Sequence, residues 1–158
     1  MPWSSWKPKD RRRPPGAWRQ FRIAVRVAGM AHRQAAVGSF IQGVRASELA
    51  GDEWGVSVQR DPGNPHHAHA LRVIGHWTER RSRWFRSPRV ERREEHIGFV
   101  PASMADELAK LGSSIPLAAE LYEIAANEGS DEPGQMGVII KIIVLIPSKN
   151  DPVWARQP

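Results

Sequence analysis

The sequence predicts a mainly β domain with two short helices, in which five or six short strands form a small, closed or nearly closed β-barrel. Apolar and polar side chains alternate in several short runs, a Pro-Gly-Asn-Pro turn separates two of these runs, and two other stretches have helical spacing. The chain has 158 residues, of which 41% are hydrophobic. This is enough to bury one core of ordinary size.

The first half of the predicted domain contains three strands and a helix. Apolar residues at 21, 23, 25 and 27 predict a half-buried strand that ends at Gly29. Residues 34–49 have helical spacing, but Gly38 and Gly43 each cost a helix about 1 kcal/mol relative to alanine, so a short or broken helix is expected. It should end at Gly51. Strands are expected at residues 54–58 and from Leu71 onward, on either side of the turn.

The second half is expected to begin with a long hairpin or loop at residues 75–95 and a short strand at 97–100. A helix over residues 103–111 should bury Ala105, Leu108 and Leu111 and end at Gly112. Closing strands are expected at 115–125 and 136–146, around a turn at 128–135. The last strand is apolar on both faces apart from Lys141, which favours a central strand covered on one side by a helix over an interface strand in a dimer.

These elements are typical of an OB-like or SH3-like barrel. The domain should span residues 21–147, including the arginine-rich hairpin insertion at 75–95. A basic, disordered arm is expected at residues 1–20 and a tail at 148–158.

Charge is distributed unevenly around the net value of +6. Residues 1–20 contain six basic side chains and one aspartate, whereas residues 96–146 contain two lysines and seven acids. Such asymmetry suits a basic face for nucleic acid, although a solvated surface with an unstructured tail gives the same pattern.

The absence of cysteine excludes disulfides and thiol catalysis. No secretory or membrane-spanning segment is visible, so a soluble, cytoplasmic protein is expected.

The most informative stretch is a proline-braced loop, Arg60-Asp61-Pro62-Gly63-Asn64-Pro65, followed by Ala70-Leu71-Arg72-Val73 and later by Gly98-Phe99-Val100-Pro101. Val27-Ala28-Gly29 and Gly51-Asp52 precede it in the same order. Over residues 21–111 this set resembles the HIRAN domain, a small β-barrel module of DNA-repair remodelling enzymes and of short bacterial proteins. The resemblance implies a non-catalytic module that binds single-stranded DNA, or its 3′ end, in DNA repair or processing.

The resemblance also implies a pocket between this loop and the segment after the first strand. In the family, aromatic side chains stack on the terminal bases, and an asparagine and an aspartate contact the terminal sugar. Carried over, the pocket residues are Asn64, His66, His67, His69, His32, Arg33 and Phe99. Histidine and arginine can also stack on bases. His67, however, replaces the aspartate as acceptor, so the preference for a 3′-hydroxyl should be weakened, or shifted toward a phosphorylated end or an internal single strand.

Basic and aromatic side chains alternate in the hairpin insertion. Trp77, Trp84 and Phe85 are candidates for stacking on bases, and the expected phosphate contacts are Arg60, Arg72, Arg80, Arg81, Arg83 and Arg86. The alternative is a hairpin whose aromatic rings pack on the barrel while its arginines face solvent. The choice between DNA and RNA, and between a monomer and a weak dimer, stays open.

His66, His67 and His69 could instead bind zinc, with Asp61 or Asp106 as a carboxylate ligand. Metal ligands normally converge from separate segments, so histidines that line a pocket or face solvent are favoured, and no cofactor is expected.

No phosphate-binding loop, nucleophile elbow or ATPase motif is present, which argues against an enzyme. The rival functions are a protein–protein adaptor that recruits a helicase or nuclease and, more weakly, a histidine-dependent zinc hydrolase.

Overall fold

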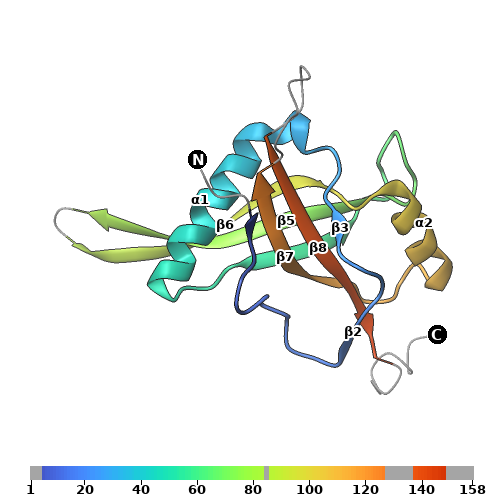
Figure 1. Cartoon of the computed structure of the whole chain (residues 1–158), viewed down its shortest axis with the longest axis horizontal. Coiled ribbons are helices and arrows are strands. Elements are labelled where there is room, and N and C mark those ends of the chain that lie inside the picture. Colours follow the sequence, from blue (N-terminus) through green and yellow to red (C-terminus); the bar gives the residue numbers. More distant parts are fainter. Residues whose placement is uncertain (1–4, 84–85, 127–136, 149–158) are drawn as a thin grey trace.

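The computed structural model describes residues 5–83, 86–126 and 137–148, and shows two antiparallel sheets and two α-helices (Figure 1). The mainly β class with two helices is therefore confirmed. Among the described residues the strands form two sheets and no closed barrel is found. No helix in these ranges is long and apolar enough to cross a membrane.

The first sheet has two long central strands and three short strands beside them. β7 pairs with β8, β1 pairs with β7, and β2 and β3 pair with successive parts of β8. The bounds are β1 Ser5–Trp6, β2 Trp18–Gln20, β3 Val25–Arg26, β7 Ala118–Ala126 and β8 Val138–Pro147. The two closing strands and the central place of the last strand are thus confirmed. The turn expected at 128–135 lies outside the described residues, as does all but Ser148 of the expected tail.

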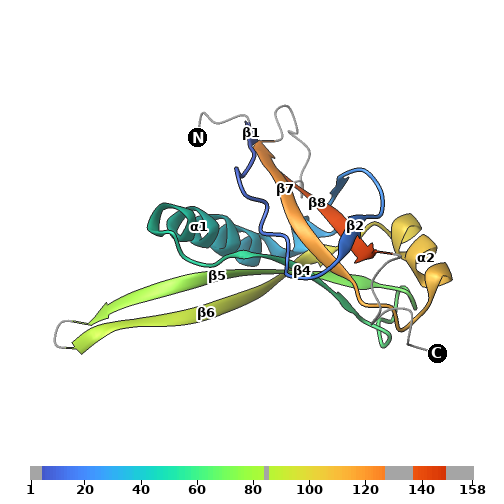
Figure 2. The ribbon, with the colours of Figure 1, turned by 90° about the horizontal axis from the view of Figure 1, so that it is seen from below.

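The second sheet has the order β4-β5-β6, with bounds β4 Gly55–Arg60, β5 Leu71–Arg83 and β6 Arg86–Phe99. β5 and β6 form the expected hairpin, a long twisted ribbon whose far end projects from the body of the molecule (Figure 2). The short separate strand expected at residues 97–100 is wrong, because these residues are the end of the 14-residue β6 and its exit.

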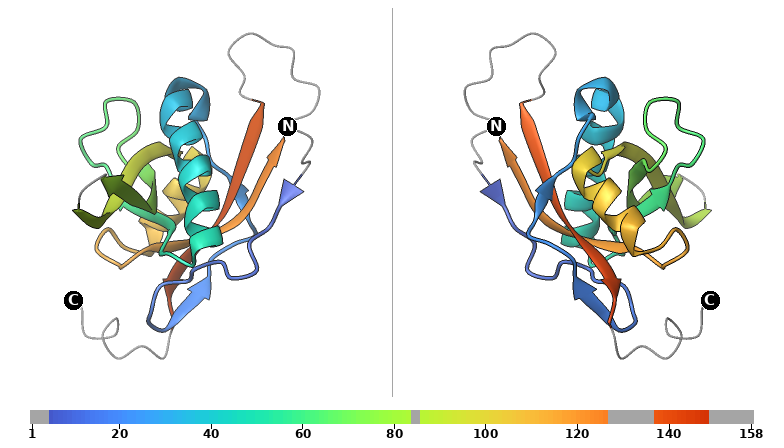
Figure 3. Two further views of the ribbon diagram at one scale, coloured as in Figure 1. Left: turned by 90° about the vertical axis from the view of Figure 1, so that its left-hand side faces the viewer. Right: turned by 90° about the vertical axis from the view of Figure 1, so that its right-hand side faces the viewer.

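Helix α1 (Gln34–Ala50) is continuous despite its glycines. It packs on the second sheet through Phe40 and Val44, both fully buried, and Figure 3 shows it running lengthwise between the strands of the two sheets. A β-carbon at Gly43 would collide with the ring of Trp77, and one at Gly75 would collide with Phe40. The expected break is therefore wrong: glycine here allows close approach of helix and sheet.

Helix α2 (Ala102–Leu111) starts one residue before the expected helix and ends where expected. Its buried side consists of Met104, Ala105 and Leu108. Leu111 is 47% exposed, so its assignment to the buried side is wrong. The residue lies in the last turn, where the chain is about to leave the core at Gly112.

The expectation of a disordered arm is wrong for residues 5–20, because the segment is attached to the first sheet at both ends. The carboxylate of Glu120 on β7, only 3% exposed, accepts a hydrogen bond from Arg13 Nε at 3.0 Å. Ile143 and Leu145 on the outer face of β8 pack against Trp18 and neighbouring side chains. The segment therefore covers the face for which the sequence predicted a helix.

The strand expected over residues 21–27 is shorter than the alternation suggests. Of these residues only Val25 and Arg26 belong to a strand, β3, and Ile23 is 80% exposed. Beyond β3, Val27 N–H still donates to the Ile140 carbonyl at 2.8 Å, and Val27 is buried. The alternation of buried and exposed residues thus holds only where the chain reaches β8.

His76 on β5 is half-buried, and its Nδ1 atom is inaccessible and has no hydrogen-bond partner. Burial lowers the pKa of His76; the positive charge of Arg92 lowers it further, while Glu53 and Glu94 act in the opposite direction. The neutral imidazole is the form that the fold favours.

Candidate nucleic-acid interface

The loop between β4 and β5 is held by the side chain of Asn64. Its Oδ1 accepts the backbone N–H groups of His66 at 2.9 Å and His67 at 3.1 Å, and its Nδ2 donates to Asp61 Oδ2 at 3.1 Å. The base of the loop closes through the Asp61 N–H, which donates to the Ala70 carbonyl at 2.9 Å. Asparagine is favoured in such turns because its amide can satisfy nearby backbone groups. The expected pocket asparagine therefore positions the loop.

The chain after β3 is brought beside β6 by a single residue pair. Ala28 N–H donates to the Phe99 carbonyl at 2.7 Å, and Phe99 N–H donates to the Ala28 carbonyl at 2.8 Å. A β-carbon at Gly98 would collide with the Ala28 carbonyl oxygen, so only glycine allows this approach. Gly29, with a φ of 73°, then turns the chain into the 3-10 helix η1 (Met30–Arg33), which presents His32 and Arg33.

These two segments and the end of β6 enclose a cavity of about 460 Å³. Its lining consists of Ala28, Gly29, His32, Arg33, Asn64, His66, His67, Ala70, Phe99, Val100 and Ala102. Of the seven residues expected in the pocket, six line this cavity. His69 does not, because its imidazole is directed to Asp106 on α2, with Nδ1 3.0 Å from Oδ1. The volume is typical of sites for small molecules or single nucleotides.

Phe99 supplies the aromatic surface of this cavity. The guanidinium of Arg33 lies over its ring, with Cζ 5.7 Å from the ring centroid. His96 approaches the ring edge-on, with the centroids 4.8 Å apart, and its Nε2 is 2.8 Å from the Gly98 carbonyl oxygen. Burial lowers the pKa of His96; the nearby Arg33 and Arg72 add to this, and the Gly98 hydrogen bond opposes it. The lowered pKa favours the neutral form of His96, which packs against the edge of Phe99 without adding a positive charge next to Arg33.

Three of the arginines expected to contact phosphates have partners within the chain. Arg60 donates to the Ile115 carbonyl at 2.7 Å, and Arg72 Nε lies 3.3 Å from Asp61 Oδ2. Arg80 forms two hydrogen bonds with the Asp52 carboxylate, at 2.6 and 2.7 Å. In this conformation the three side chains bind protein groups, so a contact with phosphate would add to these interactions or replace them.

The prediction that Trp77 stacks on a base is wrong. It is 8% exposed and packs against Phe40, with the ring centroids 6.3 Å apart, so its faces are not offered to a base. It is a core residue, as in the alternative hairpin arrangement considered above. Trp84 and Phe85 lie outside the described residues, as do the side chains of Arg81, Arg83 and Arg86.

The loop between β4 and β5, which lines the cavity, lies at the opposite end of the second sheet from the far end of the hairpin (Figures 1 and 2). β5 starts at Leu71, beside the loop, and ends at Arg83. At the usual rise of a strand, these two positions are about 40 Å apart. One bound nucleotide therefore cannot contact both regions, although the sequence placed their residues in one interface.

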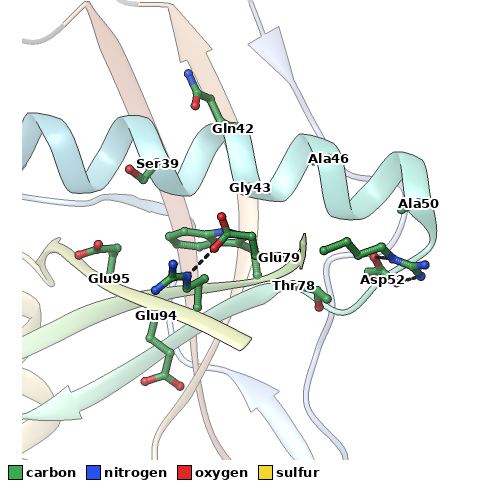
Figure 4. Close-up of a pocket in the computed structure, with 13 residues that line it drawn as sticks. Ser39, Gln42, Gly43, Ala46, Ala50, Asp52, Thr78, Glu79, Glu94 and Glu95 are labelled. Carbon is green, nitrogen blue, oxygen red and sulfur yellow. Dashed lines mark hydrogen bonds and ion pairs between the residues drawn. The ribbon is translucent and has the colours of Figure 1, made fainter. Parts of the chain in front are cut away.

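A larger cavity, of about 670 Å³, lies between α1 and the hairpin (Figure 4). Its helix side is formed by small or polar residues such as Ser39, Gly43 and Ala46. On the sheet side, Trp77 and Thr78 are joined by four acidic side chains and two arginines, and both arginines are paired with acids: Asp52, Glu79, Glu94, Glu95, Arg80 and Arg93. The excess of carboxylates is unfavourable for a polyanion, so this cavity is the poorer candidate for nucleic acid.

Sequence reasoning missed His96 and did not place Asp106 in the pocket region. His96 precedes Phe99 by three residues, and a register shift between Val73 and Ile74 brings the two rings to the same side of β6. Nothing in the sequence signals this shift. Asp106 was considered only as an optional carboxylate for the histidines, and the structure places it against His67 and His69.

Comparison with known proteins adds no assignment: no protein-family model, curated protein or solved structure matches the chain.

Proposed function

We propose that the chain is a non-catalytic nucleic-acid-binding module, and that the 460 Å³ cavity holds an unpaired nucleotide of a single strand. The observation that carries the proposal is the meeting of residues 28–33 with the loop around Asn64, beside Phe99. The resemblance to the HIRAN domain implied a pocket between these two segments, and their meeting around a cavity of nucleotide size supports that inference.

The chemistry of the lining suits a nucleotide. A base can stack on the guanidinium plane of Arg33, which already lies over Phe99, and such stacking accepts any base. His32 and His66 are exposed at the cavity and can donate hydrogen bonds to phosphate or sugar oxygens. We therefore assign recognition of the strand to base stacking and to polar contacts with its backbone, with little dependence on base identity.

The experiment is fluorescence anisotropy with a short labelled DNA strand, at low salt and with a chelator present. Arg33→Ala should weaken binding by about 5- to 150-fold, because a stacked base contributes about 1–3 kcal/mol. The matched control is Arg26→Ala, which removes the same charge from an exposed position on β3, outside the cavity. Its effect should be small.

Strands that end in a 3′-hydroxyl or a 3′-phosphate, and a blunt duplex, complete the comparison. Tight binding of the single strands and weak binding of the duplex would support the proposal. Two results would overturn the proposal. If none of the strands binds, the chain is not a nucleic-acid-binding module; if Arg26→Ala and Arg33→Ala lose affinity equally, the cavity is not the binding site.

A further inference from the structure

Three side chains from two separate segments converge beside the cavity. His67 and His69 come from the loop between β4 and β5, and Asp106 comes from the second turn of α2. Asp106 Oδ1 lies 3.2 Å from His67 Nε2 and 3.0 Å from His69 Nδ1, and the three donor atoms all lie within 4.8 Å of one another. This is the convergence from separate segments that the loop histidines alone could not supply.

We propose that His67, His69 and Asp106 bind a divalent transition-metal ion. Around zinc, ligand atoms lie about 2.0–2.2 Å from the metal, which sets the edge of a coordination tetrahedron at about 3.3 Å. The two distances to Asp106 Oδ1 are already close to that edge. Two of the three edges between the proposed ligand atoms thus already have the length that a zinc site requires.

One of these donor atoms has no hydrogen-bond partner. His67 Nε2 is inaccessible to solvent and makes no hydrogen bond, although Asp106 Oδ1 is near it. Buried polar atoms normally have a partner. One cation between the three donors would satisfy the imidazole lone pairs and the carboxylate together, whereas Asp106 Oδ1 alone has to serve two imidazoles.

The loop backbone holds both histidines ready for such an ion. Asn64 Oδ1 accepts the His67 N–H at 3.1 Å, and the His67 carbonyl accepts the Ala70 N–H at 3.2 Å, so His69 lies within a closed turn. Two neutral imidazoles and one carboxylate suit zinc, cobalt or nickel, whereas magnesium and calcium prefer oxygen ligands. Three protein ligands also leave at least one coordination position for water or another ligand.

The test uses the full chain without a histidine tag, stripped with a chelator and then desalted. Zinc binding is measured by calorimetry, and cobalt is added separately so that its visible absorption reports the coordination. We expect one ion per chain. His69→Ala and Asp106→Asn should each weaken binding by about tenfold or more, because loss of a hydrogen-bonding partner behind a ligand already costs that much.

His66→Ala is the matched control, since His66 belongs to the same loop but not to the three converging groups. It should bind zinc like the unmodified chain. Circular dichroism checks that every variant is folded, and the paired comparison of His66→Ala with His69→Ala keeps the test decisive if Asp106→Asn fails to fold. The proposal is overturned if the unmodified chain binds no zinc at micromolar concentrations, or if His66→Ala loses as much affinity as His69→Ala. No oligonucleotide is present, so this result is independent of the proposed function.

Discussion

Replacing Gly43 by alanine tests the packing of α1 on the hairpin. A methyl group at this position would collide with the ring of Trp77, which is buried and held by Phe40. Gly38 lies in the same helix, and a β-carbon there would meet nothing within 4 Å. The two glycines thus offer the same chemical change in two different surroundings.

The expected magnitudes follow from two opposing effects. Alanine stabilises a helix interior by about 1 kcal/mol relative to glycine, so Gly38→Ala should raise the free energy of unfolding by up to about that amount. At Gly43 the same gain is offset by overpacking, which costs about 1–3 kcal/mol. Because the helix term is common to both variants, the difference between them measures the collision alone. For a chain of this size it corresponds to about 2–12 °C in Tm.

The assay is urea-induced unfolding followed by far-UV circular dichroism, with the two variants measured beside the unmodified chain. Gly43→Ala should unfold at lower urea than Gly38→Ala, with an unchanged dependence on denaturant. If the two variants were equally stable, α1 could not pack on Trp77 as described, and the helix–sheet interface would have to be different.

Two further predictions concern the N-terminal segment and pH. Arg13→Ala should lower the free energy of unfolding by about 1–3 kcal/mol, because it leaves the buried Glu120 carboxylate short of a donor; the exposed Arg19→Ala is its control in the same urea assay, and equal stability of the two would contradict the role of Arg13. His76 has a lowered pKa in the folded state, so its contribution to stability is complete above the unfolded value of about 6.5 and is lost as pH falls through and below that value. Unfolding measured between pH 7.5 and 5.5 should therefore show a steeper loss for the unmodified chain than for His76→Gln, and parallel curves would count against this assignment.

Local patterns in the sequence were sufficient to predict much of the fold. Helical spacing located both helices, and the run of apolar residues on both faces identified β8 as a central strand. The N-terminal segment was misjudged because its attachment depends on partners more than a hundred residues away: Ser5 pairs with Ala125, and Arg13 with Glu120. Proline- and arginine-rich composition indicates disorder only when no such partner exists.

The candidate site shows the same division between local and long-range information. The meeting of residues 28–33 with the loop at Asn64 was inferred from a family resemblance, and the structure brings these segments together. The pairing of Arg60 with the Ile115 carbonyl and of Arg80 with Asp52 could not be inferred, since an arginine in a sequence does not reveal its acceptor. Asp106 was one of two optional carboxylates in the sequence, and the packing of α2 against the loop decides between them by placing Asp106 beside the histidines.

The Ala28–Phe99 pair links the segment after β3 of the first sheet to β6 of the second sheet. Both residues line the cavity, so the cavity lies where the two sheets meet. A compound that fills the cavity contacts residues from both sheets and therefore binds the folded chain in preference to the unfolded one. Such a compound raises the unfolding temperature, and the rise grows as its concentration exceeds its dissociation constant. Thermal-shift screening of nucleotides, short strands and metal salts can therefore search for the natural ligand without any prior assay of activity.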